Sequence, residues 1–251
     1  MSQLSTGCSV DIRQLTLRYR DANQPLFSSL DLSLPAGEWT CLLGRSGCGK
    51  TTLLRYLAGL LEDQVEWTGK LTPHNHQPTA NNIAYMAQQD LLLPWLNVLD
   101  NVCLSARFNQ PHKPDYDKAR QLLAAVGLAE RASAMPDQLS GGMRQRVALA
   151  RTLMQDKPLV LMDEPFSALD AVTRHKLQTL SANLLKGKTV LLITHDPQEA
   201  LRLGHHIHVM SGSPARLETL TVPHARPPRT FDAEMAEHQQ MIITQLENDY
   251  G

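Results

Sequence analysis

The chain has 251 residues, a length that fits one or two domains and can bury a core without disulfides. Hydrophobic residues make up 42% and charged residues 20%, which excludes a mainly disordered chain. The formal net charge of -1 gives no general attraction to nucleic acid, and no apolar run approaches the ~20 residues of a transmembrane helix. Because the first residues lack the pattern of a secretory signal, we expect a cytoplasmic protein.

The first part of the chain predicts strands. Residues 10–19 form the first, and Leu30, Leu32 and Leu34 alternate with polar neighbours as in a half-buried strand. Residues 39–44 read as a compact apolar strand. A helix is predicted next, from the spacing of five leucines at positions 53, 54, 57, 60 and 61. Residues 62–82 read as polar turns, and residues 83–87 as another short strand.

The pattern changes after Gln88. Residues 90–157 contain helical patterns at 119–126 and 142–154 and no convincing strand. Apolar strands resume at 159–162 and 190–194, separated by a helical stretch at 173–185. This order predicts an α/β core of parallel strands that is interrupted by a helical insertion.

The sharpest local pattern is GRSGCGKT at residues 44–51, which fits G-x-x-x-x-G-K-[ST] between an apolar strand and a helix. Glycines let successive N–H groups curl around a β-phosphate at the positive end of the helix. We expect Lys50 to bridge the β- and γ-phosphates and the Thr51 hydroxyl to bind Mg²⁺. An ordinary glycine turn is the alternative. The candidate nucleotide-binding residues are Gly44, Arg45, Ser46, Gly47, Cys48, Gly49, Lys50, Thr51 and Thr52, with no separate role assigned to Cys48.

A second pattern is the apolar strand at 159–162 that ends in Asp163 and Glu164. Asp163 would hold Mg²⁺ through water, and Glu164 would orient or deprotonate the attacking water. Buried strands often end in acidic loop residues, so the pattern alone is weak. The phosphate loop earlier in the chain favours the functional interpretation.

A third pattern, LSGGMRQR at residues 139–146, precedes an amphipathic helix. Ser140, Gly141 and Gly142 would open that helix with free N–H groups and so create a second anion site. A chain that binds one nucleotide does not need two γ-phosphate sites, unless the two sites act on nucleotides held by different copies of the chain. The simplest arrangement is a head-to-tail homodimer, although a plain helix cap explains the local sequence equally well.

LSGGMRQR resembles the signature motif of ATP-binding cassette (ABC) ATPases, and the other motifs follow in that family's order over roughly residues 10–215. The resemblance implies an ABC-type nucleotide-binding domain of the P-loop NTPase class, in the α/β fold class. Such a domain has a RecA-like α/β core, an antiparallel β subdomain and a helical subdomain. We expect the ATPase domain at 8–222, with the helical subdomain inserted at about 90–157. A proline-rich turn and a C-terminal helical tail would follow at 223–251.

The resemblance also assigns roles outside these three motifs. Tyr19 would stack on adenine, and Gln88 would contact Mg²⁺ or the attacking water and couple the core to the helical subdomain. Asp170 would communicate across the dimer, and His195 would contact the γ-phosphate. The implied catalytic residues are Glu164, His195 and Gln88, the implied Mg²⁺ ligands are Thr51, Gln88 and Asp163, and the partner copy would supply Ser140, Gly141, Gly142 and Asp170. Since no motif is missing, we expect ATP hydrolysis to be intact.

Residues 88–102, QQDLLLPWLNVLDNV, are similar to the corresponding stretch of bacterial importer ATPases of the nitrate, sulfonate and taurine group, which also includes transporters of thiamine-precursor pyrimidines. This implies an ATP-hydrolysing subunit that drives solute uptake as a homodimer on the inner face of the cell membrane. Its partners would be integral membrane permease subunits and, indirectly, a periplasmic or lipid-anchored solute-binding protein, with no nucleic acid. Leu92, Leu93, Pro94 and Trp95 are candidate permease contacts, and an organic sulfonate or a pyrimidine is preferred to nitrate as the solute.

Two other functions stay open. An exporter motor would share every nucleotide-site residue, and only the LLPW segment favours import. A stand-alone regulatory or nucleic-acid-linked ATPase would instead be stimulated by DNA or RNA and would have no membrane partner.

Overall fold

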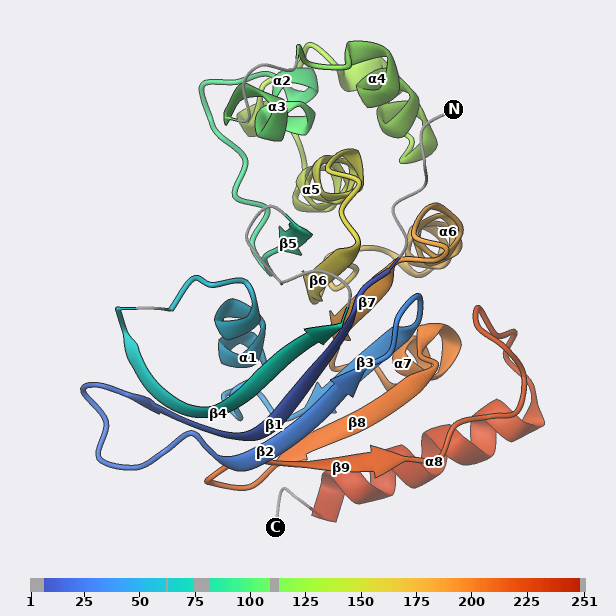
Figure 1. Cartoon of the computed structure of the whole chain (residues 1–251). Coiled ribbons are helices and arrows are strands. Elements are labelled where there is room, and N and C mark those ends of the chain that lie inside the picture. Colours follow the sequence, from blue (N-terminus) through green and yellow to red (C-terminus); the bar gives the residue numbers. More distant parts are fainter. Residues whose placement is uncertain (1–6, 62, 75–81, 109–112, 249–251) are drawn as a thin grey trace. The chain divides into compact units, whose positions relative to one another are not determined.

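A computed structural model describes residues 7–61, 63–74, 82–108 and 113–248 of the chain (Figure 1). The chain divides into two compact units. Unit 1 comprises Met1–Ile83, Lys157–Asp163 and Lys186–Gly251, and unit 2 comprises Ala84–Asp156 and Glu164–Leu185. Among the described residues, no helix has both the length and the apolar character needed to cross a membrane.

Unit 1 contains an antiparallel sheet of three strands in the order β2-β1-β4. The central strand β1 (Ser9–Tyr19) pairs with β2 (Phe27–Leu34) and with β4 (Val65–His74). The leucines of β2 at positions 30, 32 and 34 are buried and alternate with exposed neighbours, which confirms the strand that their spacing predicts.

Strand β4 contradicts the prediction of polar turns over residues 62–82. Its apolar alternation is interrupted by Gly69 and Pro73, which resemble turn residues but are tolerated here because β4 is an edge strand. A Cβ atom on Gly69 would lie 2.8 Å from the carbonyl oxygens of Arg13 and Gln14, where β1 has a register shift. Glycine therefore marks a close approach of two backbones rather than a turn. Residues 62 and 75–81 lie outside the described part of the chain.

The larger sheet carries the predicted parallel core. Within unit 1 its strands run in the order β6 (Leu159–Asp163), β7 (Thr189–Ile193), β3 (Trp39–Gly44), β8 (His206–Ser211) and β9 (Arg216–Leu220). The first four are parallel, and β9 is antiparallel to β8. Every residue of β6 and β7 is buried, as expected for strands covered on both faces.

Helices of unit 1 cover this sheet, either directly or through another helix. The helix α1 (Lys50–Leu57) contacts β6, and α7 (Pro197–Leu203) contacts both β3 and the C-terminal helix α8 (Ala233–Asn248). The predicted helix at residues 53–61 is therefore shorter than its leucines suggested. Leu60 lies beyond its end and is 53% exposed.

Unit 2 is helical. Its helices are α2 (Val98–Val102), α3 (Leu104–Phe108), α4 (Tyr116–Ala125), α5 (Gly141–Met154) and α6 (Ala171–Leu184), with 3-10 turns at Ala129–Arg131 and Pro136–Gln138. The strand β5 (Ile83–Met86) begins at the boundary between the units. Helix α5 contacts both α2 and α4, so it lies at the centre of the unit. Because α6 is grouped here, this unit is wider than the insertion predicted at about 90–157.

Candidate functional site

The loop between β3 and α1 closes tightly on neighbouring atoms. Gly44, Gly47 and Gly49 have φ angles of 146°, 83° and 108°, which residues with a Cβ atom rarely adopt. A Cβ on Gly44 would lie 2.3 Å from the carbonyl oxygen of Met210, and one on Gly49 would lie 2.9 Å from Cε1 of Phe27. The predicted phosphate loop therefore needs glycine for two reasons, the backbone angle and the lack of space.

Lys50 is buried at the start of α1. Its ammonium group donates hydrogen bonds of 2.7 Å to the carbonyl oxygens of Gly44 and Arg45, and lies 3.8 Å from Sγ of Cys48. The N-cap Gly49 supplies no side-chain cap, so the helix begins with its first-turn N–H groups beside the loop. A buried ammonium next to the positive end of a helix dipole is suited to bind phosphate.

The residues predicted to hold Mg²⁺ in unit 1 are in contact. The Thr51 hydroxyl donates a 2.7 Å hydrogen bond to Oδ2 of Asp163, which is buried at the end of β6. Asp163 is in register with Ile193 of β7, which in turn is in register with Leu42 of β3. A hydroxyl and a carboxylate side by side are the oxygen donors that Mg²⁺ prefers, so these residues fit the ion.

The loop after β7 lies at the same edge of the sheet. The Thr194 N–H donates to the carbonyl oxygen of Leu42 at 3.2 Å, and the exposed His195 follows it. Asp196 then caps α7 by accepting a hydrogen bond from the Gln198 N–H at 2.9 Å. Because β3, β6 and β7 are parallel, the phosphate loop, Asp163 and His195 all follow carboxyl ends of strands, where α/β sheets bind ligands.

Tyr19 ends β1 close to α1. Its hydroxyl lies 3.0 Å from Oγ1 of Thr52, and either atom can be the donor. This contact holds the ring beside the helix that carries Lys50 and Thr51. Stacking of the ring on adenine stays a prediction.

In unit 2, Gln88 and Glu164 are in contact. Nε2 of Gln88 donates to Oε2 of Glu164 at 3.3 Å, and Nε2 of Gln145 donates to the Glu164 carbonyl oxygen at 3.4 Å. Glu164 has a φ of 48°, a left-handed conformation that is costly for a residue other than glycine. The bond from Gln145 thus helps to hold an unfavourable backbone at the position predicted to activate water.

The predicted partner-facing residues begin helices of unit 2. Ser140 caps α5 by accepting a 3.3 Å hydrogen bond from the Met143 N–H, and Asp170 caps α6 by accepting a 3.0 Å bond from the Thr173 N–H. The N–H and hydroxyl of Thr173 lower the pKa of Asp170. A Cβ on Gly142 would lie 3.1 Å from the carbonyl oxygen of Ala168, so the two helix starts approach each other closely.

The predicted site residues thus form two groups. Unit 1 brings together Lys50, Thr51 and Asp163, and unit 2 brings together Gln88 and Glu164. The division falls at the Asp163–Glu164 peptide bond, and the predicted Mg²⁺ ligand Gln88 belongs to the second group.

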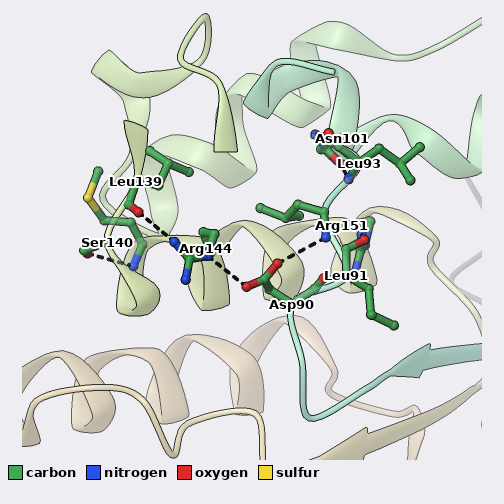
Figure 2. Close-up of polar contacts among 10 residues, drawn as sticks. Asp90, Leu91, Leu93, Asn101, Leu139, Ser140, Arg144 and Arg151 are labelled. Atoms are coloured by element: carbon green, nitrogen blue, oxygen red, sulfur yellow. Dashed lines mark hydrogen bonds and ion pairs between the residues drawn. The ribbon is translucent and has the colours of Figure 1, made fainter. Parts of the chain in front are cut away.

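Sequence reasoning missed the partners of Asp90. Its carboxylate accepts a 3.0 Å hydrogen bond from Nε of Arg144, and its carbonyl oxygen accepts a 2.6 Å bond from Nη2 of Arg151 (Figure 2). Both partners are distant in sequence, so no local pattern indicates the pairing. The sequence offered one indication that these residues matter: Asp90 stands two positions after Gln88, and Arg144 lies in the signature motif.

Among the candidate permease contacts, Trp95 is 70% exposed, but Leu92 is only 9% exposed and is unsuited to touch a partner. Leu91, which was not predicted, is 58% exposed.

A glycine loop with a buried lysine, beside a hydroxyl–carboxylate pair at the carboxyl edge of a parallel sheet, defines a P-loop nucleotide-binding α/β protein. The chain belongs to the ABC transporter family, whose sequence profile matches residues 27–167. It has the fold of an ABC nucleotide-binding domain and is an ATP-binding, ATP-hydrolysing transporter subunit.

Relatives match along almost the whole chain. An uncharacterized ABC transporter ATP-binding protein of Haemophilus influenzae is 45% identical over 242 residues, covering 94% of this chain and 98% of that protein. An aliphatic sulfonates import ATP-binding protein of Rhodococcus jostii is 41% identical over 239 residues, covering 94% of this chain and 93% of that protein. Another protein of that description, from Pectobacterium atrosepticum, is 38% identical over 249 residues, with coverage of 98% and 90%.

Among solved structures, a dimeric ATP-binding cassette in a post-hydrolysis state with ADP and Pi superposes with a TM-score of 0.72 at 29% identity. The match covers 88% of this chain and all of that one. A metal-chelate type ABC transporter in an inward-facing conformation gives a TM-score of 0.69 at 28% identity, covering 85% and 84%.

Proposed function

We propose that this chain is the ATPase subunit of an importer for organic sulfonates, acting as a head-to-tail homodimer on the cytoplasmic side of a separate membrane permease. The observation that carries the proposal is the near full-length similarity to aliphatic sulfonates import ATP-binding proteins. A solute-binding protein would deliver the sulfonate to the permease, so this chain does not touch the solute.

The residues of unit 1 bind ATP. Tyr19 holds the adenine ring, the loop N–H groups surround the β-phosphate, and the Lys50 ammonium neutralises the β- and γ-phosphates. In that state Lys50 exchanges its present acceptors, the carbonyl oxygens of Gly44 and Arg45, for phosphate oxygens. Thr51 and Asp163 would hold Mg²⁺, which supplies positive charge to the phosphate oxygens.

Hydrolysis requires the residues of unit 2 as well. Glu164 accepts a proton from the attacking water, while Gln88, already hydrogen-bonded to its carboxylate, orients that water. His195 donates to a γ-phosphate oxygen. From the partner copy, Ser140, Gly141 and Gly142 present the start of α5 to the same phosphate, and Asp170 contacts the first copy across the dimer.

Replacing Glu164→Gln removes the general base and keeps the shape of the side chain. We expect turnover to fall by roughly 10²–10⁴-fold, the usual loss for a general base, while ATP binding persists. Steady-state phosphate release and titration with a fluorescent ATP analogue measure the two effects. Turnover within about threefold of wild type would remove Glu164 from this role.

Light scattering of purified Glu164→Gln protein tests the shared site. A dimer should form with ATP and disappear when Ser140→Arg is added, because arginine would fill the space at the start of α5. A monomer under all conditions would contradict a dimer held together by nucleotide alone.

Growth tests the sulfonate assignment. A strain that lacks this chain should fail to grow on ethanesulfonate as sole sulfur source but grow on sulfate. The wild-type chain should restore growth, and the Glu164→Gln variant should not. Normal growth of the deletion strain on ethanesulfonate would reject this class of solute and leave the ATPase assignment unaffected. Stimulation of the purified protein by DNA would instead favour the nucleic-acid-linked alternative.

A further inference from the structure

Asp90 accepts hydrogen bonds from three other residues of unit 2. Besides the bonds to Arg144 and Arg151, its Oδ1 accepts a 3.1 Å bond from the Leu92 N–H (Figure 2). The side chains of Arg144 and Asp90 are 37% and 27% exposed, so this ion pair is partly shielded from water. The exposed turn after Gln88 is therefore fixed to two points of α5, at Arg144 and at Arg151.

The turn held in this way has a strained backbone. Leu91 has a φ of 47°, which is unfavourable for a residue with a branched side chain, and its carbonyl oxygen accepts a 2.8 Å bond from Nη1 of Arg151. The guanidinium of Arg151 thus donates hydrogen bonds to two consecutive carbonyl oxygens, those of Asp90 and Leu91. Burial lowers the pKa of Arg151, and Asp90 opposes this effect. Such a conformation persists only where several contacts specify it.

The other end of the network reaches the signature motif. Nη1 of Arg144 donates a 2.8 Å bond to the carbonyl oxygen of Leu139, the residue before Ser140. The same guanidinium donates to Asp90 through Nε. Because a guanidinium is planar and rigid, these two bonds fix the position of Leu139 relative to Asp90.

A buried amide secures the far side of the turn. Oδ1 of Asn101 accepts a 2.8 Å bond from the Leu93 N–H, and its Nδ2 donates to the carbonyl oxygens of Leu93 and Leu96. The segment between Asp90 and Leu96, which includes the exposed Trp95, is thus attached to α5 at one end and to α2 at the other.

We propose that Asp90, Arg144 and Arg151 are positioning residues, which make the exposed turn at 91–95 and the signature loop at 139–142 move as one body. The inference rests on the proposed function, in which the signature loop binds the nucleotide of the partner copy. A force on the turn, such as contact with a membrane partner, would be transmitted through Arg144 to Ser140. In this proposal the network sets the placement of the signature loop and not its chemistry.

ATP-dependent dimerisation in the Glu164→Gln background provides the first test. Asp90→Ala and Arg144→Ala should each weaken the dimer by about tenfold, the effect of losing one charge-assisted hydrogen bond. The loss in the double variant should be smaller than the sum of the two single losses, because each substitution removes the shared bond between Arg144 and Asp90. Arg144→Lys should stay weakened, since an ammonium cannot span Asp90 and Leu139. Binding of an ATP analogue to the monomer should not change.

The matched control is Arg120→Ala. Arg120 pairs with Asp117 on α4 in the same unit, with a separation of 3.4 Å and side chains that are 59% and 91% exposed. Removing this ion pair should leave the dimer unchanged. Additive losses from Asp90→Ala and Arg144→Ala, or unaltered dimers of both, would overturn the inference.

Amide hydrogen exchange of the monomer tests the network without a dimer. The Met143 N–H donates a hydrogen bond to the Ser140 hydroxyl oxygen. Its hydrogen should exchange several-fold faster in Asp90→Ala than in the parent or in Arg120→Ala. Equal exchange in all three would overturn the positioning role even if the parent never dimerises. A parent that stays monomeric, with faster exchange in Asp90→Ala, would instead contradict a dimer held together by nucleotide alone and leave the network in place.

Discussion

Positions 44 and 47 of the phosphate loop require glycine for different reasons, which predicts different losses of stability on substitution. Gly47→Ala meets only the backbone cost of its φ of 83°, because nothing lies within 4 Å of the added Cβ. We expect a loss of about 1–2 kcal/mol in the free energy of unfolding. Gly44→Ala should lose several kcal/mol, roughly 3 or more, because its Cβ would also collide with the Met210 carbonyl oxygen. Urea unfolding measures both, and equal losses would contradict this account.

A second effect at the scale of single residues concerns His208 in β8. Burial, followed by the nearby His206, lowers its pKa to about 4. Since the unfolded chain has the ordinary histidine pKa of about 6.5, it binds more protons than the folded protein between these values. Stability should therefore fall as the pH falls from about 6.5 towards 4, by about 1–2 kcal/mol at pH 5.

Urea unfolding at pH 7 and pH 5 checks this prediction. The variant His208→Gln should lose much of the pH dependence. Some should remain, because burial also lowers the pKa of His205, whose Nδ1 accepts a 3.1 Å bond from the Trp39 N–H. An unchanged slope in His208→Gln would show that His208 does not cause it.

At the scale of elements, one buried side chain contributes strongly to the attachment of the C-terminal segment. Arg229 is 4% exposed and donates to the carbonyl oxygens of Leu201 and Gly204 at the end of α7, and to those of Pro223 and Ala225 before α8. Arg229→Ala would leave buried carbonyl groups without these donors. We expect a loss of about 3 kcal/mol in the free energy of unfolding.

Thermal unfolding and limited proteolysis measure the effect. Cleavage between α7 and α8 should become faster in Arg229→Ala, while binding of an ATP analogue at Lys50 should persist. The exposed Arg226 offers a control, and Arg226→Ala should behave as wild type. Equal behaviour of the two variants would rule out this anchoring role.

At this scale, the sequence predicted those features whose pattern lies within one contiguous segment. The strands β6 and β7 are uninterrupted apolar runs, and the phosphate loop and signature motif are contiguous, so their patterns indicated them directly. Strand β4 was missed because Gly69 and Pro73, which suit a close approach and a sheet edge, are also typical of turns. The contacts of Asp90 with Arg144 and Arg151 depend on the packing of distant segments, which no local pattern encodes.

At the scale of the whole molecule, the proposed catalytic machinery is distributed over the two units. Lys50, Thr51 and Asp163 belong to unit 1, whereas Glu164 and Ser140 belong to unit 2. A head-to-tail pair of copies would form two composite sites, each with the phosphate loop of one copy and the signature loop of the other. Such an arrangement predicts that two inactive variants can complement each other.

Mixing Lys50→Ala with Ser140→Arg tests this prediction. Each variant alone should hydrolyse almost no ATP, because Lys50→Ala damages every phosphate loop and Ser140→Arg damages every signature loop. A mixed dimer contains one site with the intact loop of the Ser140→Arg copy and the intact signature of the Lys50→Ala copy. Random pairing of equal amounts would restore about one quarter of the wild-type rate if the two sites work independently, and this is the upper limit because Ser140→Arg also weakens pairing.

Phosphate release after mixing measures the recovery. The control mixes Lys50→Ala with the double variant Lys50→Ala/Ser140→Arg, which leaves no site with an intact phosphate loop and should remain inactive. Recovery in the first mixture alone would mean that the loop and the signature of one site come from different copies. Absence of recovery in both, in mixtures that light scattering shows to contain dimers, would contradict a dimer with two independent composite sites. Recovery in the control would show that Lys50 is dispensable for hydrolysis.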